Sequence, residues 1–316
     1  MYNLFYISNY IVLNNYLNII NSNKIPLNKC LFYSPRLNYE DMNLSIRINL
    51  IDLNSINCDN KLTLIKKLKK HTLGERYVLF VPHFINKREK ILVNSRFCTG
   101  YNLVEEGYPA YTLVTKDNKL NYFPRNIFRD KYIQCYGNNK LSFDGLKNKI
   151  VMPLKFKHIQ KKEVHFFVPD NANIIAIDSL KIFENAQNYL FSLVFMFQLL
   201  SKNNKRNIYL KYHPDYNSSP KFKDNIEHIA KTNKLNPLRL PNNVFIEELV
   251  NSNHVYNIYN VASSLLIYVA KSKSNIYLFP SILRKDSTFN EVDNYIKGII
   301  QKLNLTVKEV DLDQIN

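Results

Sequence analysis

Short apolar runs that end in polar turns alternate along this chain with longer stretches in which apolar residues recur at helical spacing. Residues 77–81, YVLFV, are typical of a buried parallel strand, and residues 62–71, with a KKLKK cluster, are typical of a basic amphipathic helix. The alternation predicts α/β domains rather than an all-α or all-β fold. The other expected strands are residues 4–7, 30–33, 44–51, 101–104, 164–168, 207–211, 244–246, 254–258 and 275–279. The other expected helices are residues 10–20, 179–200, 220–231, 262–270 and 289–303.

The alternation of short apolar runs and helical stretches is absent between residues 116 and 162, where Lys, Arg and Asn are frequent and Pro124 and Pro153 interrupt the chain. We interpret this stretch as the region between two domains. A chain of 316 residues is also longer than one core usually serves, since single hydrophobic cores stop growing near ~250–300 residues. The sequence therefore predicts two domains, residues 1–158 and 159–316, with the last helix packing back on the first domain.

The charge balance favours anionic partners. Lysine and arginine total 43 against 26 acidic residues, which gives a net charge of +17. Nucleic acid, anionic lipid surfaces and phosphorylated or carboxylated sugars all fit that charge, and scattered surface lysine accounts for part of it. The six glycines form neither a GxGxxG nor a GxxxxGK[ST] loop, which argues against dinucleotide-dependent dehydrogenases and P-loop enzymes.

The N-terminal segment, MYNLFYISNYIVLNNYLNII, is not expected to be a signal peptide, because it lacks a basic start and is interrupted by asparagines. The longest apolar stretch, residues 189–200, is shorter than the ~20 residues that cross a bilayer. We therefore expect a cytoplasmic protein with peripheral contact to the anionic inner face of the membrane.

Two carboxylates follow directly after the strand expected at 101–104. Glu105 and Glu106 precede Gly107, which lets the chain turn sharply at the strand end. A carboxylate at the edge where open α/β sheets bind ligands can serve as a general base. A solvated turn is the alternative interpretation of this short motif.

Two further clusters lie at strand ends in the second half of the chain. His213 follows the sequence IYLKY and is restricted by Pro214, so its imidazole is placed to donate to a phosphate; Lys211 alternates with it along the strand. Ser263 and Ser264 stand where a helix begins, where hydroxyls and free N–H groups bind an anion. A histidine hydrogen-bonded within its loop and a serine that caps its helix are the alternatives.

The order of the three clusters resembles that of the bacterial CMP-sialic acid sialyltransferases of the lipooligosaccharide and polysialic acid type. Those families carry a D/E-D/E-G motif, then an HP motif, then an S-S/T motif. The sequences YLKYHPDYNSSPKF and HVYNIYNVASSLLIYVA are similar to their nucleotide-binding segments, and the resemblance covers residues 164–280. It implies a GT-B fold, in which two Rossmann-like domains face each other across a cleft.

The resemblance also implies roles for individual residues in an inverting, metal-independent transfer to a glycan such as lipooligosaccharide, O-antigen or capsule. Glu105 or Glu106, with Glu105 preferred, would take the proton of the acceptor hydroxyl beside Gly107, and His213 would assist the departure of CMP. Glu247, with Glu248 as the alternative, would accept hydrogen bonds from the ribose. The residues expected to bind CMP are Lys211, His213, Pro214, Glu247, Ser263 and Ser264.

Some features depart from the family, and other functions remain open. Pro109 follows the acidic motif, and VASSLL lacks the glycine that usually precedes the serine pair. A CMP-Kdo or CDP-glycerol donor is the alternative within the enzyme class, and a basic nucleic-acid-binding protein is the alternative outside it; we expect no nucleic-acid partner, because no recognition motif is present. We expect no cofactor and no metal, since the DxD sequence at residues 311–313 lies in the C-terminal tail.

Overall fold

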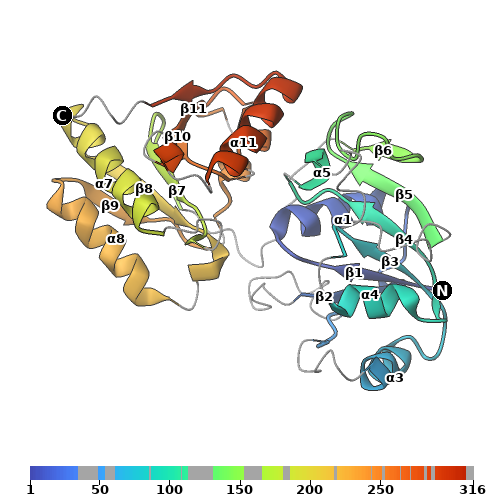
Figure 1. The fold of residues 1–316 in the computed structure, drawn as a ribbon. Coiled ribbons are helices and arrows are strands. Elements are labelled where there is room, and N and C mark those ends of the chain that lie inside the picture. The colour runs from blue at the N-terminus through green and yellow to red at the C-terminus, as the bar shows by residue number, and fades with distance from the viewer. Residues whose placement is uncertain are drawn as a thin grey trace. The chain divides into compact units, whose positions relative to one another are not determined.

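The structure is a computed structural model that describes residues 1–34, 49–53, 61–84, 87–107, 109–112, 131–152, 166–180, 186–216, 219–242, 244–250, 253–263, 265–270, 272–280, 283–285 and 289–310. The chain divides into two compact units, Met1–Glu163 and Val164–Asn316. Each unit contains one six-stranded parallel sheet (Figure 1). The boundary expected between residues 158 and 159 lies outside the described residues.

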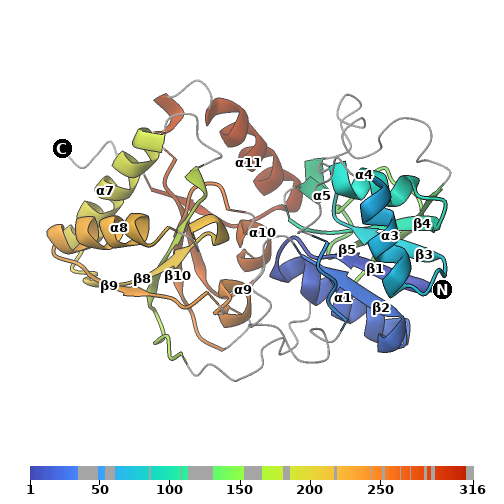
Figure 2. The same cartoon turned by 90° about the horizontal axis from the view of Figure 1, so that it is seen from below.

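The first unit is a parallel sheet with helices on both faces. Its strands are β1 (Tyr2–Tyr6), β2 (Cys30–Tyr33), β3 (Tyr77–Val81), β4 (Cys98–Val104), β5 (Tyr132–Gly137) and β6 (Lys149–Val151), and its helices are α1 (Tyr10–Ser22), α3 (Lys61–His71), α4 (Lys87–Asn94) and α5 (Pro109–Thr112), with a 3-10 turn η1 (Leu27–Lys29). The strand order is β2-β1-β3-β4-β5-β6. Helix α1 covers one face, and α3 and α4 cover the other (Figures 1 and 2).

Helix α1 is fixed to its sheet by packing and by one buried hydroxyl. Asn9 caps the helix, since its side-chain oxygen accepts a hydrogen bond from the backbone N–H of Val12 at 2.9 Å. The Tyr16 hydroxyl donates to the carbonyl oxygens of Tyr6, at 2.7 Å, and Phe80, at 3.0 Å, at the ends of β1 and β3. The helix therefore fixes the ends of the neighbouring strands β1 and β3 relative to each other.

The second unit has the strand order of a Rossmann fold. Its strands are β7 (Asn173–Ile177), β8 (Asn207–Tyr212), β9 (Asn236–Arg239), β10 (Asn257–Asn260), β11 (Asn275–Leu278) and β12 (Lys308–Glu309), and its helices are α7 (Ala186–Lys202), α8 (Pro220–Thr232), α9 (Ile246–Leu249), α10 (Leu265–Val269) and α11 (Phe289–Leu303), with 3-10 turns η5 (Pro214–Tyr216) and η6 (Leu283–Lys285). The order β12-β11-β10-β7-β8-β9 corresponds to 6-5-4-1-2-3 within the unit. Helices α7 and α8 pack on one face of the sheet, in a core that includes Leu193 and Ile226. In the part of the chain that the structure describes, no helix is long and apolar enough to cross a membrane.

Three expectations about secondary structure are wrong. Residues 131–152 belong to the first sheet rather than to a linker, because β5 and the edge strand β6 are only partly buried and tolerate polar residues. Residues 244–246 are not a strand, since Ile246 begins the helix α9, and residues 166–168 form no strand. The expected strand at 44–51 falls mostly outside the described residues, as does much of the expected linker.

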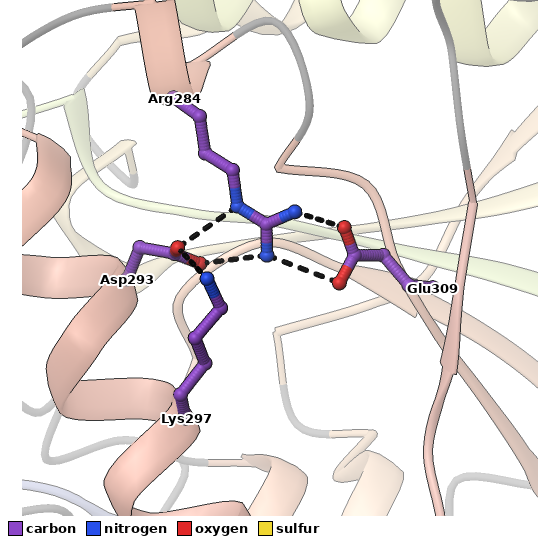
Figure 3. Close-up of polar contacts among 4 residues, drawn as sticks. All are labelled: Arg284, Asp293, Lys297 and Glu309. Carbon is purple, nitrogen blue, oxygen red and sulfur yellow. Dashed lines mark hydrogen bonds and ion pairs between the residues drawn. The ribbon is translucent and has the colours of Figure 1, made fainter.

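An ion-pair cluster joins three segments near the end of the second unit (Figure 3). Arg284 in η6 donates to both carboxylate oxygens of Asp293 in α11, at 2.8 and 3.0 Å, and also binds the carboxylate of Glu309 in β12. Lys297 binds Asp293 from one turn further along α11, at 2.7 Å. Burial raises the pKa of Asp293, but the hydrogen bonds from Arg284 and Lys297 outweigh this effect and hold the pKa below its ordinary value. The cluster thereby fixes the last helix and the last strand to the same sheet.

Candidate functional site

The second sheet changes direction at its first strand. From β7 the chain proceeds outward to β8 and β9, and then returns to place β10 on the other side of β7. Open α/β sheets bind ligands at the carboxyl ends of their strands beside such a switch point. The residues that follow β10, β7 and β8 therefore define the first candidate site, and they include Ser263, Asp178 and His213.

His213 is fixed in one orientation directly after β8. Its backbone N–H donates to the carbonyl of Ile177 at 3.0 Å, and its ring nitrogen Nδ1 accepts from the backbone N–H of Asp215 at 3.2 Å. The Asp215 carboxylate lies 3.6 Å from the same nitrogen and accepts from the Ser179 hydroxyl at 2.7 Å. Because Nδ1 acts as an acceptor, the neutral ring carries its proton on Nε2. The side chain is 41% exposed, so an Nε2–H donor can reach a ligand.

Ser263 caps a short helix, which is the alternative to anion binding that the sequence also allowed. Its hydroxyl oxygen accepts from the backbone N–H of Leu265 at 3.2 Å, at the start of α10. Just before it, the N–H groups of Val261 and Ala262 both donate to one carboxylate oxygen of Asp178, at 3.1 and 3.3 Å. Capping leaves the Ser263 hydroxyl proton available for donation, and Ser264 lies outside the described residues.

Asp178 organises this edge of the sheet and was missed by the sequence analysis. It follows β7, which was itself not predicted, and its side chain is only 4% exposed. Burial raises its pKa to about 7, although the two backbone hydrogen bonds act in the opposite direction. The backbone of Asp178 is also held, since the hydroxyl of Tyr189 accepts from its N–H at 2.7 Å and that of Tyr216 donates to its carbonyl at 2.9 Å. One buried acid thus connects the ends of β7 and β10.

Asn260, the last residue of β10, is a second position that the sequence analysis missed. It is 0% exposed, and within the described ranges neither the nitrogen nor the oxygen of its side-chain amide has a hydrogen-bond partner. Its neighbours Tyr259 and Val261 belong to the core under α7 and α8, so Asn260 points to the opposite face. A buried amide without partners is costly, which is typical of a group that meets a ligand or an ordered water.

Lys211 points to the same face as Asn260 but is occupied by backbone. Its ammonium donates to the carbonyls of Pro241 and Asn242, each at 2.9 Å, in the segment that precedes α9. Burial lowers its pKa to about 8, while Glu247 in the first turn of α9 acts in the opposite direction. Burial likewise raises the pKa of Glu247. Lys211 therefore positions the segment that carries Glu247. Its ammonium binds backbone carbonyl groups, so it would support the nucleotide site rather than contact the phosphate directly.

The first unit has a similar switch point, between β1 and β3, with the acidic motif beside it. Glu105 is completely buried after β4. Its carboxylate accepts from the hydroxyl of Tyr111 at 2.8 Å, and from the Ser142 hydroxyl and the Asn138 backbone N–H at 2.5 Å each. Its backbone carbonyl accepts from the Asn15 side chain at 3.0 Å. Glu105 therefore anchors the turn after β5 and is enclosed by protein.

Glu106 is the more accessible carboxylate, and it has a histidine partner. Its carboxylate lies 3.1 Å from Nε2 of His83, which follows β3, and its side chain is 15% exposed. The Asn9 side chain donates to the Glu106 carbonyl at 3.4 Å, so residues after β1, β3 and β4 meet at this edge. Ser8, at the end of β1, is 3% exposed, and its hydroxyl has no partner in the described part of the chain. His83 and Ser8 carry no sequence motif, and only the topology reveals them.

Gly107 has the conformation that the sequence predicted for it. Its φ is +133°, which side chains rarely adopt, and its carbonyl accepts from the N–H of Ala110 at 3.0 Å. Pro109, which departs from the family pattern, begins α5 directly after this turn. The described residues contain no group of three or more His, Cys, Asp and Glu side chains that would hold a metal, and residues 311–313 lie outside them.

Similarity to known proteins is found at the level of structure only. No family model matches it, and no curated protein matches it. Among solved structures, an S. aureus MnaA–UDP structure is similar over 96% of this chain and 89% of that chain, with a TM-score of 0.53 and 9% identity. WaaG, a glycosyltransferase involved in lipopolysaccharide biosynthesis, matches over 99% and 88%, with a TM-score of 0.48 and 10% identity. A UDP-N-acetylglucosamine 2-epimerase from Rickettsia bellii matches over 96% and 98%, with a TM-score of 0.47 and 11% identity.

The fold is of the GT-B class. The full-length likeness to the MnaA structure and the two parallel six-stranded sheets agree on this point. At 9% identity the likeness shows the fold and not the reaction. The assignment of chemistry to this GT-B chain therefore depends on its own residues at the two switch points.

Proposed function

We propose that this chain is an inverting sialyltransferase that moves sialic acid from CMP-sialic acid to a hydroxyl group of a glycan. The observation that carries the proposal is the placement of His213 beside a Rossmann switch point, with its ring oriented by Asp215. The order of the acidic, HP and serine motifs along the chain supports the cytidine nucleotide and the sialyl group. The acceptor is a lipid-linked or capsular glycan, in keeping with the net charge of +17.

In the proposed reaction, the second unit stabilises the leaving group. The bond between the anomeric carbon and the phosphate oxygen of CMP breaks, and negative charge accumulates on that phosphate. The Nε2–H of His213 donates to the departing oxygen, and the Ser263 hydroxyl donates to a second phosphate oxygen. Asp178 acts at a distance, because it fixes the backbone that presents Ser263. Glu247 accepts from the ribose hydroxyls.

The base of the proposed reaction is Glu106. The acceptor oxygen forms the new bond to the anomeric carbon, and its proton passes to the Glu106 carboxylate. We now prefer Glu106 to Glu105, because Glu105 is fully buried and already accepts three hydrogen bonds on its carboxylate. The two glutamates thus have different tasks, one catalytic and one architectural.

A panel of sugar donors tests the nucleotide and the sugar. Release of the nucleotide and formation of product are measured with CMP-sialic acid, CMP-Kdo, CDP-glycerol and UDP-N-acetylglucosamine. The last donor is included because the MnaA structure of the same fold contains UDP. We expect turnover with CMP-sialic acid, with and without a chelator. Turnover with the UDP-sugar alone would overturn the cytidine assignment, and turnover with CMP-Kdo alone would overturn the sialyl assignment.

His213→Gln tests the phosphate contact. We expect transfer to fall by about 10²–10³-fold and the affinity for CMP to fall by about tenfold, since a charge-assisted hydrogen bond is lost. The matched control is His254→Gln, which removes another exposed histidine of the same unit and should change neither quantity. Equal effects of both variants would contradict a specific role for His213.

The adjacent glutamates form a matched pair for testing the base. Glu106→Gln should lower transfer by about 10²–10⁴-fold, with the affinity for CMP and the melting temperature unchanged. Glu105→Gln should instead destabilise the fold by about 2–4 kcal/mol, because an amide group would face hydrogen-bond donors in a buried site. A stable but inactive Glu105→Gln, together with an active Glu106→Gln, would reverse the assignment.

A further inference from the structure

Helix α3 has an unusual outer face. Leu64 and Leu68 are buried against the rest of the first unit, as in any amphipathic helix. The opposite side carries Leu62, which is 72% exposed, and Lys66 and Lys69, which are also exposed. Their spacing of four and three residues places them on one stripe of the helix. A large apolar side chain therefore lies in line with lysines on the solvent side.

The stripe ends in a second exposed leucine. Leu73 follows the helix, is 81% exposed, and has a φ of +51°, in the left-handed region that usually takes Gly or Asn at a helix end. Solvent exposure and backbone conformation both disfavour leucine at this position. Residues held against such preferences concentrate at sites of function. Leu62 and Leu73 thus border the lysines at the two ends of the helix.

The charge around this stripe is positive. Lys70 is exposed next to Lys69, and the Phe97 ring lies 5.7 Å from the Lys69 ammonium and 5.1 Å from the guanidinium of the exposed Arg96. The acidic residues that flank α3 in the described segments are already paired. Asp52 binds Lys67 at 3.6 Å, and Glu75 binds Lys29 at 2.7 Å and the N-terminal amine at 2.6 Å.

We propose that the outer face of α3 docks on an anionic lipid surface, with Leu62 and Leu73 inserted among the acyl chains and Lys66, Lys69 and Lys70 on the headgroups. Paired apolar anchors that border cations are the pattern of a helix that lies in the plane of a membrane interface. A nucleic acid would also attract the lysines, but it gives no reason for two exposed leucines. None of these residues belongs to either candidate site, so the proposal does not depend on the proposed sugar donor.

Sedimentation with vesicles tests the surface on the full chain. Vesicles of phosphatidylcholine with about one third phosphatidylglycerol are compared with pure phosphatidylcholine. We expect binding to the anionic vesicles only. The variant Leu62→Gln/Leu73→Asn should bind about tenfold more weakly or worse, because apolar insertion is lost. Since Asn suits a left-handed φ better than Leu does, Leu73→Asn should keep or raise the melting temperature, so weaker binding would not reflect unfolding.

Charge variants separate this surface from the general positive charge of the protein. Lys66→Gln/Lys69→Gln/Lys70→Gln should weaken binding to anionic vesicles by about tenfold or more. The matched control, Lys221→Gln/Lys231→Gln/Lys234→Gln, removes three exposed lysines of the second unit and should change binding less than twofold. Equal losses in the two triple variants would overturn the proposal, as would equal binding by wild type and the leucine variant. If the protein bound a single-stranded oligonucleotide tightly through the α3 lysines and did not bind vesicles, the lipid proposal would be overturned. The ligand of this surface would then be a nucleic acid.

Discussion

The buried carboxyl of Asp178 should make the stability of the protein depend on pH near neutrality. Burial raises its pKa from the ordinary value of 3.8 to about 7. The folded protein therefore holds this proton more tightly than the unfolded chain does. The resulting stabilisation is fully present below about pH 4 and is lost as the pH rises through about 7. At about 1.4 kcal/mol per pH unit, the whole loss amounts to about 4 kcal/mol.

The substitution Asp178→Asn removes the titration while keeping the shape of the side chain. The amide oxygen can still accept from the N–H groups of Val261 and Ala262. Between pH 5 and pH 8 we expect wild type to lose about 2.5 kcal/mol that the variant does not lose. Urea unfolding of the full chain, followed by far-ultraviolet circular dichroism at four pH values, measures the difference.

The control for Asp178→Asn is Asp144→Asn, which removes the charge of an exposed aspartate in the first unit. Its stability should follow that of wild type at every pH. If the curves of wild type and Asp178→Asn instead ran parallel from pH 5 to pH 8, the carboxyl would be titrating normally. That result would refute the account of Asp178 as a desolvated acid at the switch point.

Three further predictions concern the second unit. Asn260→Ala should weaken CMP binding by about tenfold without loss of stability, since its buried side-chain amide has no partner among the described residues and we expect it to bind the nucleotide. Calorimetric titration with CMP would show no change if Asn260 is not in the site. Arg284→Met should destabilise the protein by about 2–3 kcal/mol at pH 7, measured by urea unfolding, because Asp293 would retain only Lys297; a loss below about 0.5 kcal/mol would contradict this. Because the pKa of Asp293 is lowered, its contribution to stability is present above the ordinary value of 3.8 and is lost as the pH falls through the lower pKa of the folded protein. Wild type and Arg284→Met should therefore converge in stability as the pH falls below 3.8, and a difference that stays constant would contradict this.

Much of the fold was predictable because several of its strands and amphipathic helices have a strong hydrophobic pattern, although the buried strand β7 was missed. The strands β2 and β3 and the helix α11 begin and end at the predicted residues. Their sequences are continuous apolar runs or regular helical stripes, which depend little on distant contacts. Strands at the edges of the sheets, such as β6 and β9, were not predicted, since partial exposure leaves their sequences polar.

The candidate site was predictable only where a short motif marks it. His213 and Ser263 were found because HP and SS follow apolar strands, and the acidic pair was found in the same way. Asp178, His83 and Asn260 were missed, because each is a single polar residue outside any motif. Each is brought to a candidate site only by the pairing of its strand with a neighbouring strand. The choice of Glu106 over Glu105 as the base also depended on the hydrogen bonds around each carboxylate. Two adjacent glutamates look equivalent in the sequence, so this difference could not be predicted from it.

The two edge strands of the second sheet bear on how copies of this protein behave at high concentration. The outermost strand β12 is only Lys308–Glu309, both exposed, and β9 at the other edge carries Pro237 and Arg239. Charged side chains, proline and short length all discourage strands of separate molecules from pairing edge to edge. The next strand in the sheet is β11, which pairs with β12 and whose Tyr277 stacks on Tyr259 with ring centroids 4.8 Å apart. The Arg284 cluster holds β12 in place and thereby keeps the edge of β11, with its Tyr277, covered. A protein in which the Arg284 cluster is broken should therefore aggregate before its helices unfold.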